Sequence, residues 1–260
     1  MFLGVDIGSS STKAAIVNGD KKIMAISVVN LGTGTKGLNC ALNNALRDAK
    51  IKSDDLKYTV ATGYGRLNCD IADRQITEIT CHAKGVKELV GGAKTVIDIG
   101  GQDAKVITLD CNGSVSNFIM NEKCAAGTGR FLEVMARVLG CEFDDLSELA
   151  SKSTKDIAIN NVCTVFAESE VISRLASGES IENVARGAHI AIAKRITGMC
   201  NRIGCDHNIV MTGGVALNQD MVDCLSRELK DEVKVVPHCQ AVGAIGAAIY
   251  AYEIYNKNNR

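Results

Sequence analysis

Short apolar runs alternate with polar, glycine-rich turns along this chain. The first such pattern is VDIGSSSTKAAIV, in which the apolar runs Phe2–Ile7 and Ala14–Val17 flank a polar turn. The second is IDIGGQDAKVITL, with apolar runs Thr95–Ile99 and Val106–Leu109. Each is followed by an Asn-Gly pair, which is typical of a tight hairpin turn. The pattern therefore predicts two β-hairpins.

The two hairpins align as an internal repeat. The matched pairs are Asp6 and Asp98, Ile7 and Ile99, Gly8 and Gly100, and Lys13 and Lys105. A repeated strand–turn–strand unit predicts two lobes, each built around a hairpin whose tip faces the other lobe, with room for a nucleotide between them. We place the N-terminal lobe at residues 1–92 and the C-terminal lobe at 93–260, with the final helix returning to the first lobe.

The rest of the chain reads as an alternation of helices and strands, which indicates an α/β protein. The further strands expected are Tyr58–Thr62, Ile209–Thr212 and Lys234–Val236. The helices expected are Ile76–Leu89, Arg130–Leu139, Glu168–Ala176, Ile181–Ile203, Asn218–Leu229 and Gly243–Tyr252. Two segments begin with a cysteine and continue as helices, one from Cys124 and one from Cys163.

Composition narrows the class of protein. Among 260 residues, 29 Lys and Arg balance 30 Asp and Glu, so nothing favours binding to nucleic acid through charge. One proline and 46% hydrophobic residues exclude disorder as the main state. No apolar run approaches the roughly 20 residues of a membrane span, and MFLGVDIGSSSTK lacks the basic region, apolar run and cleavage site of a signal peptide. We expect a cytoplasmic protein without a membrane partner.

The polar turns suit a phosphate chain. Backbone N–H groups of a Gly/Ser turn and a nearby lysine are the usual ligands of phosphate, and Gly8–Lys13 supplies both. Around Gly100, the side chains of Asp98, Gln102 and Asp103 occupy the matching place. Aspartates from two lobes suit a hydrated magnesium ion, and Gln102 or Asp103 could orient an attacking water. The alternative is that the glycines only form turns and the aspartates cap them.

A third glycine motif is Met211-Thr212-Gly213-Gly214-Val215-Ala216, a strand that runs into a glycine pair. A flat base could lie against this bare backbone. Close packing at the start of a helix explains the glycines equally well.

Eleven cysteines are present, without any CxxC pair. Cys124 and Cys163 differ from the rest because a helix dipole would favour a thiolate or an anionic cluster there. Two ligands cannot complete a four-thiolate site, whereas a two-fold dimer could. The others are interpreted as buried small apolar residues. They are Cys40, Cys69, Cys81, Cys111, Cys141, Cys200, Cys205, Cys224 and Cys239.

These residues resemble a known family. VDIGSSSTK, IDIGGQDAK and MTGGVALN are similar to the phosphate and adenosine motifs of the superfamily of actin, heat-shock ATPases and sugar kinases. NEKCAAGTGRFLEV, VCTVFAESEV, ATGYGR and QAVGAIGAAIYAY resemble the activators (component A) of 2-hydroxyacyl-CoA dehydratases and relatives that serve benzoyl-CoA reductases and double-cubane proteins. The similarity covers nearly the whole chain.

The resemblance implies duplicated actin-like (ribonuclease H-like) ATPase lobes with the nucleotide cleft between them. It further implies an oxygen-sensitive homodimer of anaerobic metabolism, with one 4Fe-4S cluster held between subunits by Cys124 and Cys163. ATP binding and hydrolysis would drive one low-potential electron to an iron-sulfur 2-hydroxyacyl-CoA dehydratase or related reductase. Ferredoxin or flavodoxin would be the upstream donor.

The candidate site residues follow from the motifs and the resemblance together. Those expected to bind ATP or ADP and Mg²⁺ are Asp6, Gly8, Ser9, Ser10, Ser11, Thr12, Lys13, Asp98, Gly100, Gly101, Gln102, Gly127, Thr128, Gly213, Gly214, Val215 and Gln240. Gln102 and Asp103 are the catalytic candidates. One alternative is a small-molecule kinase with Asp103 as base toward a substrate hydroxyl. Another is an actin-like filament or chaperone-type ATPase, which leaves the two cysteines unexplained.

Overall fold

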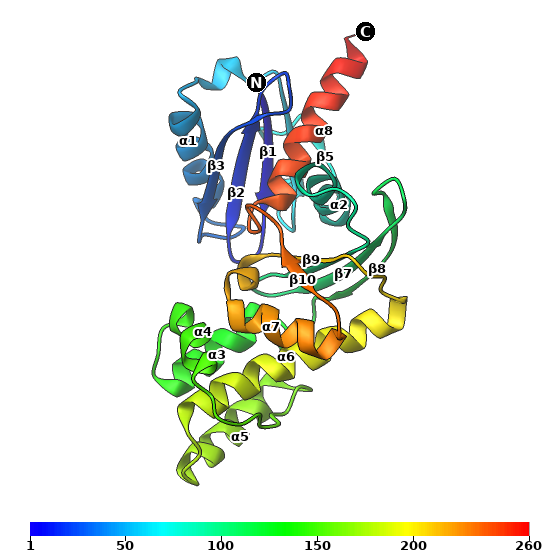
Figure 1. Ribbon diagram of the computed structural model, residues 1–260. Coiled ribbons are helices and arrows are strands. Elements are labelled where there is room, and N and C mark those ends of the chain that lie inside the picture. The colour runs from blue at the N-terminus through cyan, green and yellow to red at the C-terminus, as the bar shows by residue number, and fades with distance from the viewer. Residues whose placement is uncertain (260) are drawn as a thin grey trace. The chain divides into compact units, whose positions relative to one another are not determined.

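The computed structural model describes residues 1–259 and separates into two compact units (Figure 1). The first unit comprises Met1–Ala93, Leu109–Ser116 and the chain from Val236. The second comprises Lys94–Thr108 and Asn117–Val235. Each unit contains a five-stranded sheet with helices, so the protein is a mixed α/β protein.

The sheet of the first unit has the order β3-β2-β1-β4-β5. Its strands are β1 (Phe2–Ile7), β2 (Thr12–Val17), β3 (Ile23–Val29), β4 (Tyr58–Thr62) and β5 (Arg74–Gln75). The first three pair antiparallel, whereas β4 runs parallel to β1 and β5 runs parallel to β4. The helices are α1 (Gly37–Ala49), α2 (Glu78–Leu89), α8 (Val242–Asn258) and the 3-10 turns η1 (Ser53–Asp55) and η2 (Arg66–Asn68).

Alternating residues of β1 and β2 build two separate cores in this unit. Leu3, Val5 and Ile16 pack toward α1, while Phe2 and Val17 pack toward α8. On the α8 side, a Cβ at Gly4 would overlap the backbone of Ala244, so the helix lies directly on the strand. Two buried faces explain why β1 and β2 read as nearly continuous apolar runs.

The sheet of the second unit has the order β10-β9-β6-β7-β8. Its strands are β6 (Thr95–Ile99), β7 (Ala104–Leu109), β8 (Val115–Asn121), β9 (Ile209–Thr212) and β10 (Val233–Val235), the ends of β7 and β8 falling in the first unit. The helices are α3 (Gly129–Leu139), α4 (Leu146–Ser151), α5 (Thr164–Ala176), α6 (Ile181–Ile203), α7 (Gln219–Leu229) and the 3-10 turns η3 (Phe143–Asp145) and η4 (Gly214–Leu217).

The two hairpins of the repeat also share a backbone hydrogen bond in their polar turns. The Gly8 N–H donates to Ser11 O at 3.0 Å, and the Gly100 N–H donates to Asp103 O at 2.9 Å, so both polar turns close in the same way. The predicted tight Asn-Gly turns are wrong. Each connection is longer, because the Asn18 and Asp110 side chains accept hydrogen bonds from N–H groups two and four residues onward.

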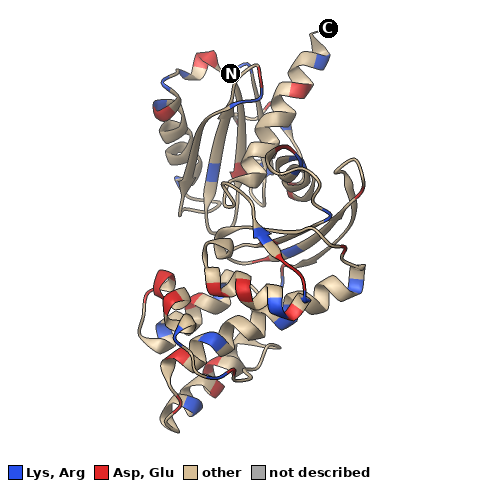
Figure 2. Ribbon diagram, in the orientation of Figure 1, with Lys and Arg blue, Asp and Glu red and all other residues tan. Residues whose placement is uncertain are grey.

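The other predicted elements lie within a few residues of their observed bounds, with two larger differences. The helix after Cys163 begins at Thr164, one turn earlier than expected, and α8 continues past Tyr252 to Asn258. The sequence analysis gave no ranges for α1, α4, β3, β5 or β8. Positive and negative side chains are interspersed along the helices, whereas the strands are largely uncharged (Figure 2). Within residues 1–259, we find no helix that meets the length and hydropathy of a membrane span.

Candidate functional site

The first polar turn, Gly8–Thr12, is held firmly by the loop that follows β3. The Thr33 N–H donates to Gly8 O at 2.9 Å, and the Thr12 hydroxyl donates to Leu31 O at 2.7 Å. A Cβ at Gly32 would overlap the Ser9 backbone, so the two loops are in contact. Ser10 remains exposed at the tip. The turn is therefore preorganised to present backbone and hydroxyl groups to a ligand.

Asp6, at the end of β1, is the charged group next to this turn. It is only 4% exposed, and its Oδ1 has no hydrogen-bond partner. Its Oδ2 lies 3.5 Å from Lys13 Nζ, a loose ion pair that leaves part of the lysine exposed. A buried carboxylate oxygen without a donor is costly unless a cation or water satisfies it. Asp6 therefore fits a magnesium ion, which takes carboxylate and water oxygens.

The second polar turn carries the same residue types in a closed arrangement. The Lys105 side chain is 1% exposed and lies between two carboxylates, 3.1 Å from Asp98 Oδ2 and 2.7 Å from Asp103 Oδ2. The Thr212 hydroxyl donates to Asp98 Oδ1 at 2.8 Å. Asp103 is thereby held by an ion pair, while Gln102 is exposed at the tip. Of the two catalytic candidates, Gln102 has the freer side chain.

The second unit brings three of the predicted glycine segments together. The Gly129 N–H donates to Gly100 O at 2.9 Å, and the Arg130 N–H donates to Gly101 O at 2.7 Å. A Cβ at Gly129 would lie 3.4 Å from Val215, and one at Gly213, where φ is +90°, would overlap Ile99 O. The lack of a side chain at Gly129 and Gly213 therefore lets these backbone segments pack directly against one another.

Two predicted nucleotide-binding residues, Thr128 and Gln240, are not part of these contacts between glycine segments. Thr128 is the N-cap of α3, but its hydroxyl donates back to Ala125 O at 2.7 Å and so closes the preceding turn. Gln240 belongs to the first unit, half-buried just before α8.

The sequence analysis missed a second repeat. Thr62-Gly63 ends β4 beside β1, and Thr212-Gly213 ends β9 beside β6, with Asp6 paired to Thr62 and Asp98 paired to Thr212 across the parallel strands. Both glycines have φ near +90°. The shared Thr-Gly dipeptide in ATGYGR and MTGGVA was the available signal, and it was obscured because different elements follow the two glycines.

The cysteines Cys124 and Cys163 converge within the second unit. Cys163 is the N-cap residue of α5, and its N–H donates to the Asn160 side chain at 3.3 Å. Cys124 Sγ lies 3.7 Å from the carbonyl oxygen of Val162, the residue before Cys163. The helix that follows Cys124 begins at Gly129, one residue before its predicted start, and not at the cysteine itself. Cys124 lies in a turn four residues before the N-cap Thr128, and the Asn121 amide fixes this turn by donating to Cys124 O and Ala126 O.

Exposed apolar side chains surround Cys163. Val162, Val165 and Phe166 are each about two-thirds exposed, and Ile172 on the same helix is also exposed. Adjacent exposed apolar residues of this kind are typical of a protein-protein contact. The two cysteines therefore lie beside a surface suited to a second protein chain.

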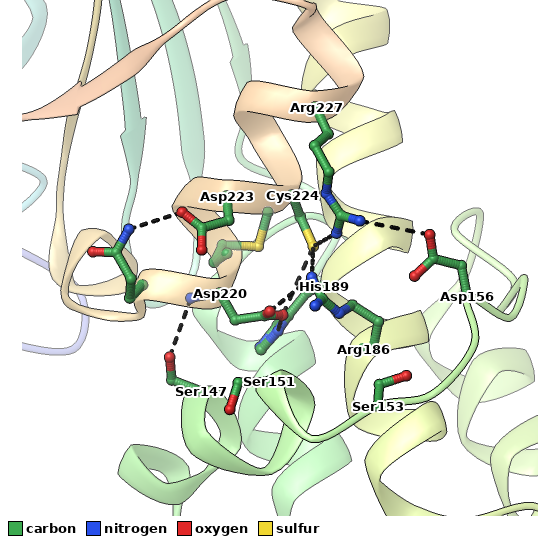
Figure 3. Close-up of polar contacts among 12 residues, drawn as sticks. Ser147, Ser151, Ser153, Asp156, Arg186, His189, Asp220, Asp223, Cys224 and Arg227 are labelled. Carbon is green, nitrogen blue, oxygen red and sulfur yellow. Dashed lines mark hydrogen bonds and ion pairs between the residues drawn. The ribbon is translucent and has the colours of Figure 1, made fainter.

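A buried polar network joins α6 to α7 (Figure 3). His189 Nδ1 lies 2.6 Å from Asp220 Oδ2, and Arg186 lies 2.8 Å from the other oxygen of that carboxylate. The Asn218 amide contacts His189 Nε2 at 3.1 Å, while its oxygen caps α7 by accepting from the Met221 N–H. The network fixes the start of α7, and with it the segment that follows the Gly213-Gly214 pair.

Comparison with solved structures gives the class of protein: the chain has the fold of the actin-like ATPases. A glucokinase of Streptomyces griseus in complex with glucose and AMPPNP shares this fold at 14% identity, with a TM-score of 0.59 over 97% of this chain and 99% of the kinase. A much closer structure is the activator of the 2-hydroxyisocaproyl-CoA dehydratase from Clostridium difficile with bound ADPNP. It is 43% identical, with a TM-score of 0.96, over 100% of this chain and 97% of the activator.

The sequence comparisons place the chain within that class. Residues 3–251 match the BadF/BadG/BcrA/BcrD ATPase family, and the chain belongs to this family. The activator of lactoyl-CoA dehydratase from Anaerotignum propionicum is 52% identical over 255 residues, which cover 98% of each chain. The predicted family and fold are confirmed.

Proposed function

We propose that this protein is an ATP-dependent one-electron donor that activates an iron-sulfur 2-hydroxyacyl-CoA dehydratase or a related reductase. The observation that carries the proposal is the convergence of Cys124 and Cys163 beside an exposed apolar surface. The identity with dehydratase activators over nearly the whole chain supports the choice of partner. A cytoplasmic location and ferredoxin or flavodoxin as upstream donor belong to the same proposal.

ATP is proposed to bind to the polar turns. In the first unit, the Gly8–Thr12 backbone and Lys13 would hold phosphate oxygens, and the free Oδ1 of Asp6 would face the water shell of magnesium. In the second unit, the Gly100-Gly101 backbone and the Gly213–Val215 segment would hold the nucleotide. Gln102, exposed at its turn, is the residue proposed to orient water for hydrolysis.

The cysteines fit half of a four-thiolate site. Cys124 and Cys163 are half-buried and close together, and a second copy of the chain would bring the other two thiolates. Covering Val162, Val165 and Phe166 in the same contact would remove apolar surface from water. A 4Fe-4S cluster bound there would supply one low-potential electron.

The backbone suggests how nucleotide and cysteines are coupled. Gly129 and Arg130, at the start of α3, donate directly to Gly100 O and Gly101 O of the second turn. Cys124 belongs to the turn that enters α3, closed by Asn121 and Thr128. A movement of the Gly100 turn when phosphate binds or leaves therefore shifts the segment that carries Cys124. Coupling through one contiguous segment is a physical route for a nucleotide to change the surroundings of a cluster.

The test is anaerobic purification followed by iron and sulfide analysis and EPR of the dithionite-reduced protein, with and without ATP. We expect about four irons and four sulfides per dimer, as for one 4Fe-4S cluster, and a signal that shifts on adding nucleotide. Cys163→Ala should lose the iron and keep ATP binding. Cys141→Ala is the matched control, because Cys141 is also a half-buried cysteine of the second unit.

The contrary outcomes are distinct. If Cys163→Ala loses ATP binding and keeps its iron, the assignment of this cysteine is wrong. If the wild-type protein contains no iron but transfers the ATP phosphoryl group to a small molecule, the kinase alternative replaces the proposal. Activation itself is measured in a mixed assay that contains this protein, a purified 2-hydroxyacyl-CoA dehydratase, a reduced electron donor and ATP.

A further inference from the structure

A pair of cysteines outside the proposed site lies at the end of α6. Cys200 belongs to the last turn of the helix, and Cys205 follows the terminal residue Gly204, which is left-handed with φ of +72°. The Gly204 N–H donates to Cys200 O at 3.0 Å, and the Cys205 N–H donates to the same oxygen at 3.2 Å. The second bond closes a Schellman-type end, in which the side chains of these two positions come into contact.

The two thiols interact, and their exposure differs. The Cys200 thiol is 1% exposed and lies beside Cys205, whose N–H donates to Cys200 O at this helix end. The interaction with Cys200 lowers the pKa of the Cys205 thiol. The pKa of Cys200 is raised, first by sharing its proton with Cys205 and then by burial. Cys205 is half-buried between exposed neighbours, so a small molecule can reach it.

We propose that Cys205 and Cys200 form an oxidation site, in which Cys205 reacts with a hydroperoxide and Cys200 resolves the product to an intramolecular disulfide. The Cys205 thiolate attacks the peroxide, the O–O bond breaks, and the protein holds a sulfenic acid while an alcohol or water leaves. The Cys200 sulfur then attacks the Cys205 sulfur. The S–S bond forms, the S–O bond breaks, and the hydroxide leaves as water with the Cys200 proton.

The chain contains its own comparison for this site. Cys141 occupies the same place after α3, because Gly140 is left-handed and the Cys141 N–H donates to Ala136 O at 3.1 Å. Its partner position is an alanine, so it has no resolving thiol there. Burial raises the pKa of the Cys141 thiol, the opposite direction from Cys205. The same helix end therefore yields a paired thiol in one case and an inert one in the other.

The experiment treats the full chain, purified anaerobically, with a small excess of hydrogen peroxide and then blocks free thiols by alkylation. Trypsin cleaves after Arg202, between the two cysteines, so only a disulfide keeps the peptides 196–202 and 203–227 together. We expect this linked pair, lighter by two hydrogen atoms and separated by dithiothreitol. Because Cys224 lies in the second peptide, fragmentation assigns the bonded sulfur.

Variants decide between a resolved pair and isolated oxidation. Cys200→Ala should retain the sulfenic acid at Cys205, trapped as a dimedone adduct that the wild type lacks. Cys205→Ser should lose the linked peptides, and Cys141→Ser should keep them. The proposal is overturned if peroxide oxidises Cys205 in the wild type without linking it to Cys200, or if Cys205→Ser still links the two peptides. None of these readouts depends on iron or ATP, so they stand apart from the test of the proposed function.

Discussion

The two copies of the Asp–turn–Lys hairpin differ in how completely their charges are satisfied. In the second copy, Lys105 is buried between Asp98 and Asp103, and Thr212 donates to the remaining Asp98 oxygen. In the first copy, Lys13 makes one loose ion pair, and Asp6 keeps a buried oxygen without a partner. One duplicated motif thus provides a closed ion-pair cluster in one unit and an incompletely satisfied carboxylate, the proposed ligand site, in the other.

The largest expected effect is a difference in folding stability between variants of Lys105 and Lys13. Lys105→Met leaves two carboxylates, one of them fully buried, without their cation, and we expect a loss of about 3–5 kcal/mol in the free energy of unfolding. Lys13→Met removes a looser pair, at 3.5 Å, whose lysine is 16% exposed, and should therefore cost less than Lys105→Met. Urea unfolding followed by circular dichroism measures both. A larger loss for Lys13→Met would reverse the comparison.

Asp6 and Asp98 should differ in their effect on magnesium-dependent ATP hydrolysis. Asp6→Asn should weaken magnesium-dependent ATP hydrolysis by about 10²-fold or more, because an amide cannot replace a charged oxygen at the ion's water shell. Its folding stability should change little. Asp98→Asn is the matched variant, expected to lower stability more than it lowers hydrolysis measured well below its unfolding temperature. Equal losses of hydrolysis in the two variants would show that both carboxylates serve the ion.

The two threonines test the smaller difference between the sites. Thr212→Val removes the donor to Asp98 and leaves a buried carboxylate oxygen less satisfied, which costs about 1–3 kcal/mol. Thr62→Val, at the matched position beside Asp6, should be nearly neutral because Thr62 makes no bond to that carboxylate. Both substitutions preserve shape, and thermal unfolding without nucleotide compares them. A costly Thr62→Val would mean that the first site is closed as well.

The smallest effect concerns the thiol next to Asp6. Burial, with the Asp6 and Glu78 charges adding, raises the pKa of Cys81 from 9.0 to about 12. The unfolded chain therefore releases this proton first, so stability is full below pH 9 and falls as pH rises toward 12. Between pH 9 and 10 the loss should be about 1 kcal/mol. Urea midpoints of wild type and Cys81→Ala across this range isolate the contribution, and parallel slopes would contradict it.

The sequence predicted the fold well because the repeat and the buried strands leave strong patterns. Ile181–Ile203 was predicted at its observed bounds, since Ser180 supplies an N-cap and Gly204 a left-handed end. The helix α1 was missed although its apolar residues keep helical spacing, because no capping side chain marks its start. Local propensity is weak where tertiary packing decides.

The sequence predicted which residue types form the candidate site, but not which copy of the hairpin has its charges satisfied. IDIGGQDAK differs from VDIGSSSTK by Asp103, which pairs with Lys105, but the closed state also depends on Thr212, more than a hundred positions away. The closeness of Cys200 and Cys205 was likewise missed, since it depends on the left-handed Gly204 and not on a recognised spacing. Long-range contacts and helix ends therefore carry the information that the motifs lack.

The placement of α8 has a consequence for biosynthesis. Among the described elements this helix is synthesised after all the others, yet it covers one face of the sheet formed by the first strands, with Ala244 against Gly4. On a ribosome, residues 1–93 emerge with that face bare and wait for 242–258, while the intervening segment already contains the strands and helices of the second unit. Folding in the order of translation thus favours the second unit, and the first unit closes only when synthesis has passed Asn258.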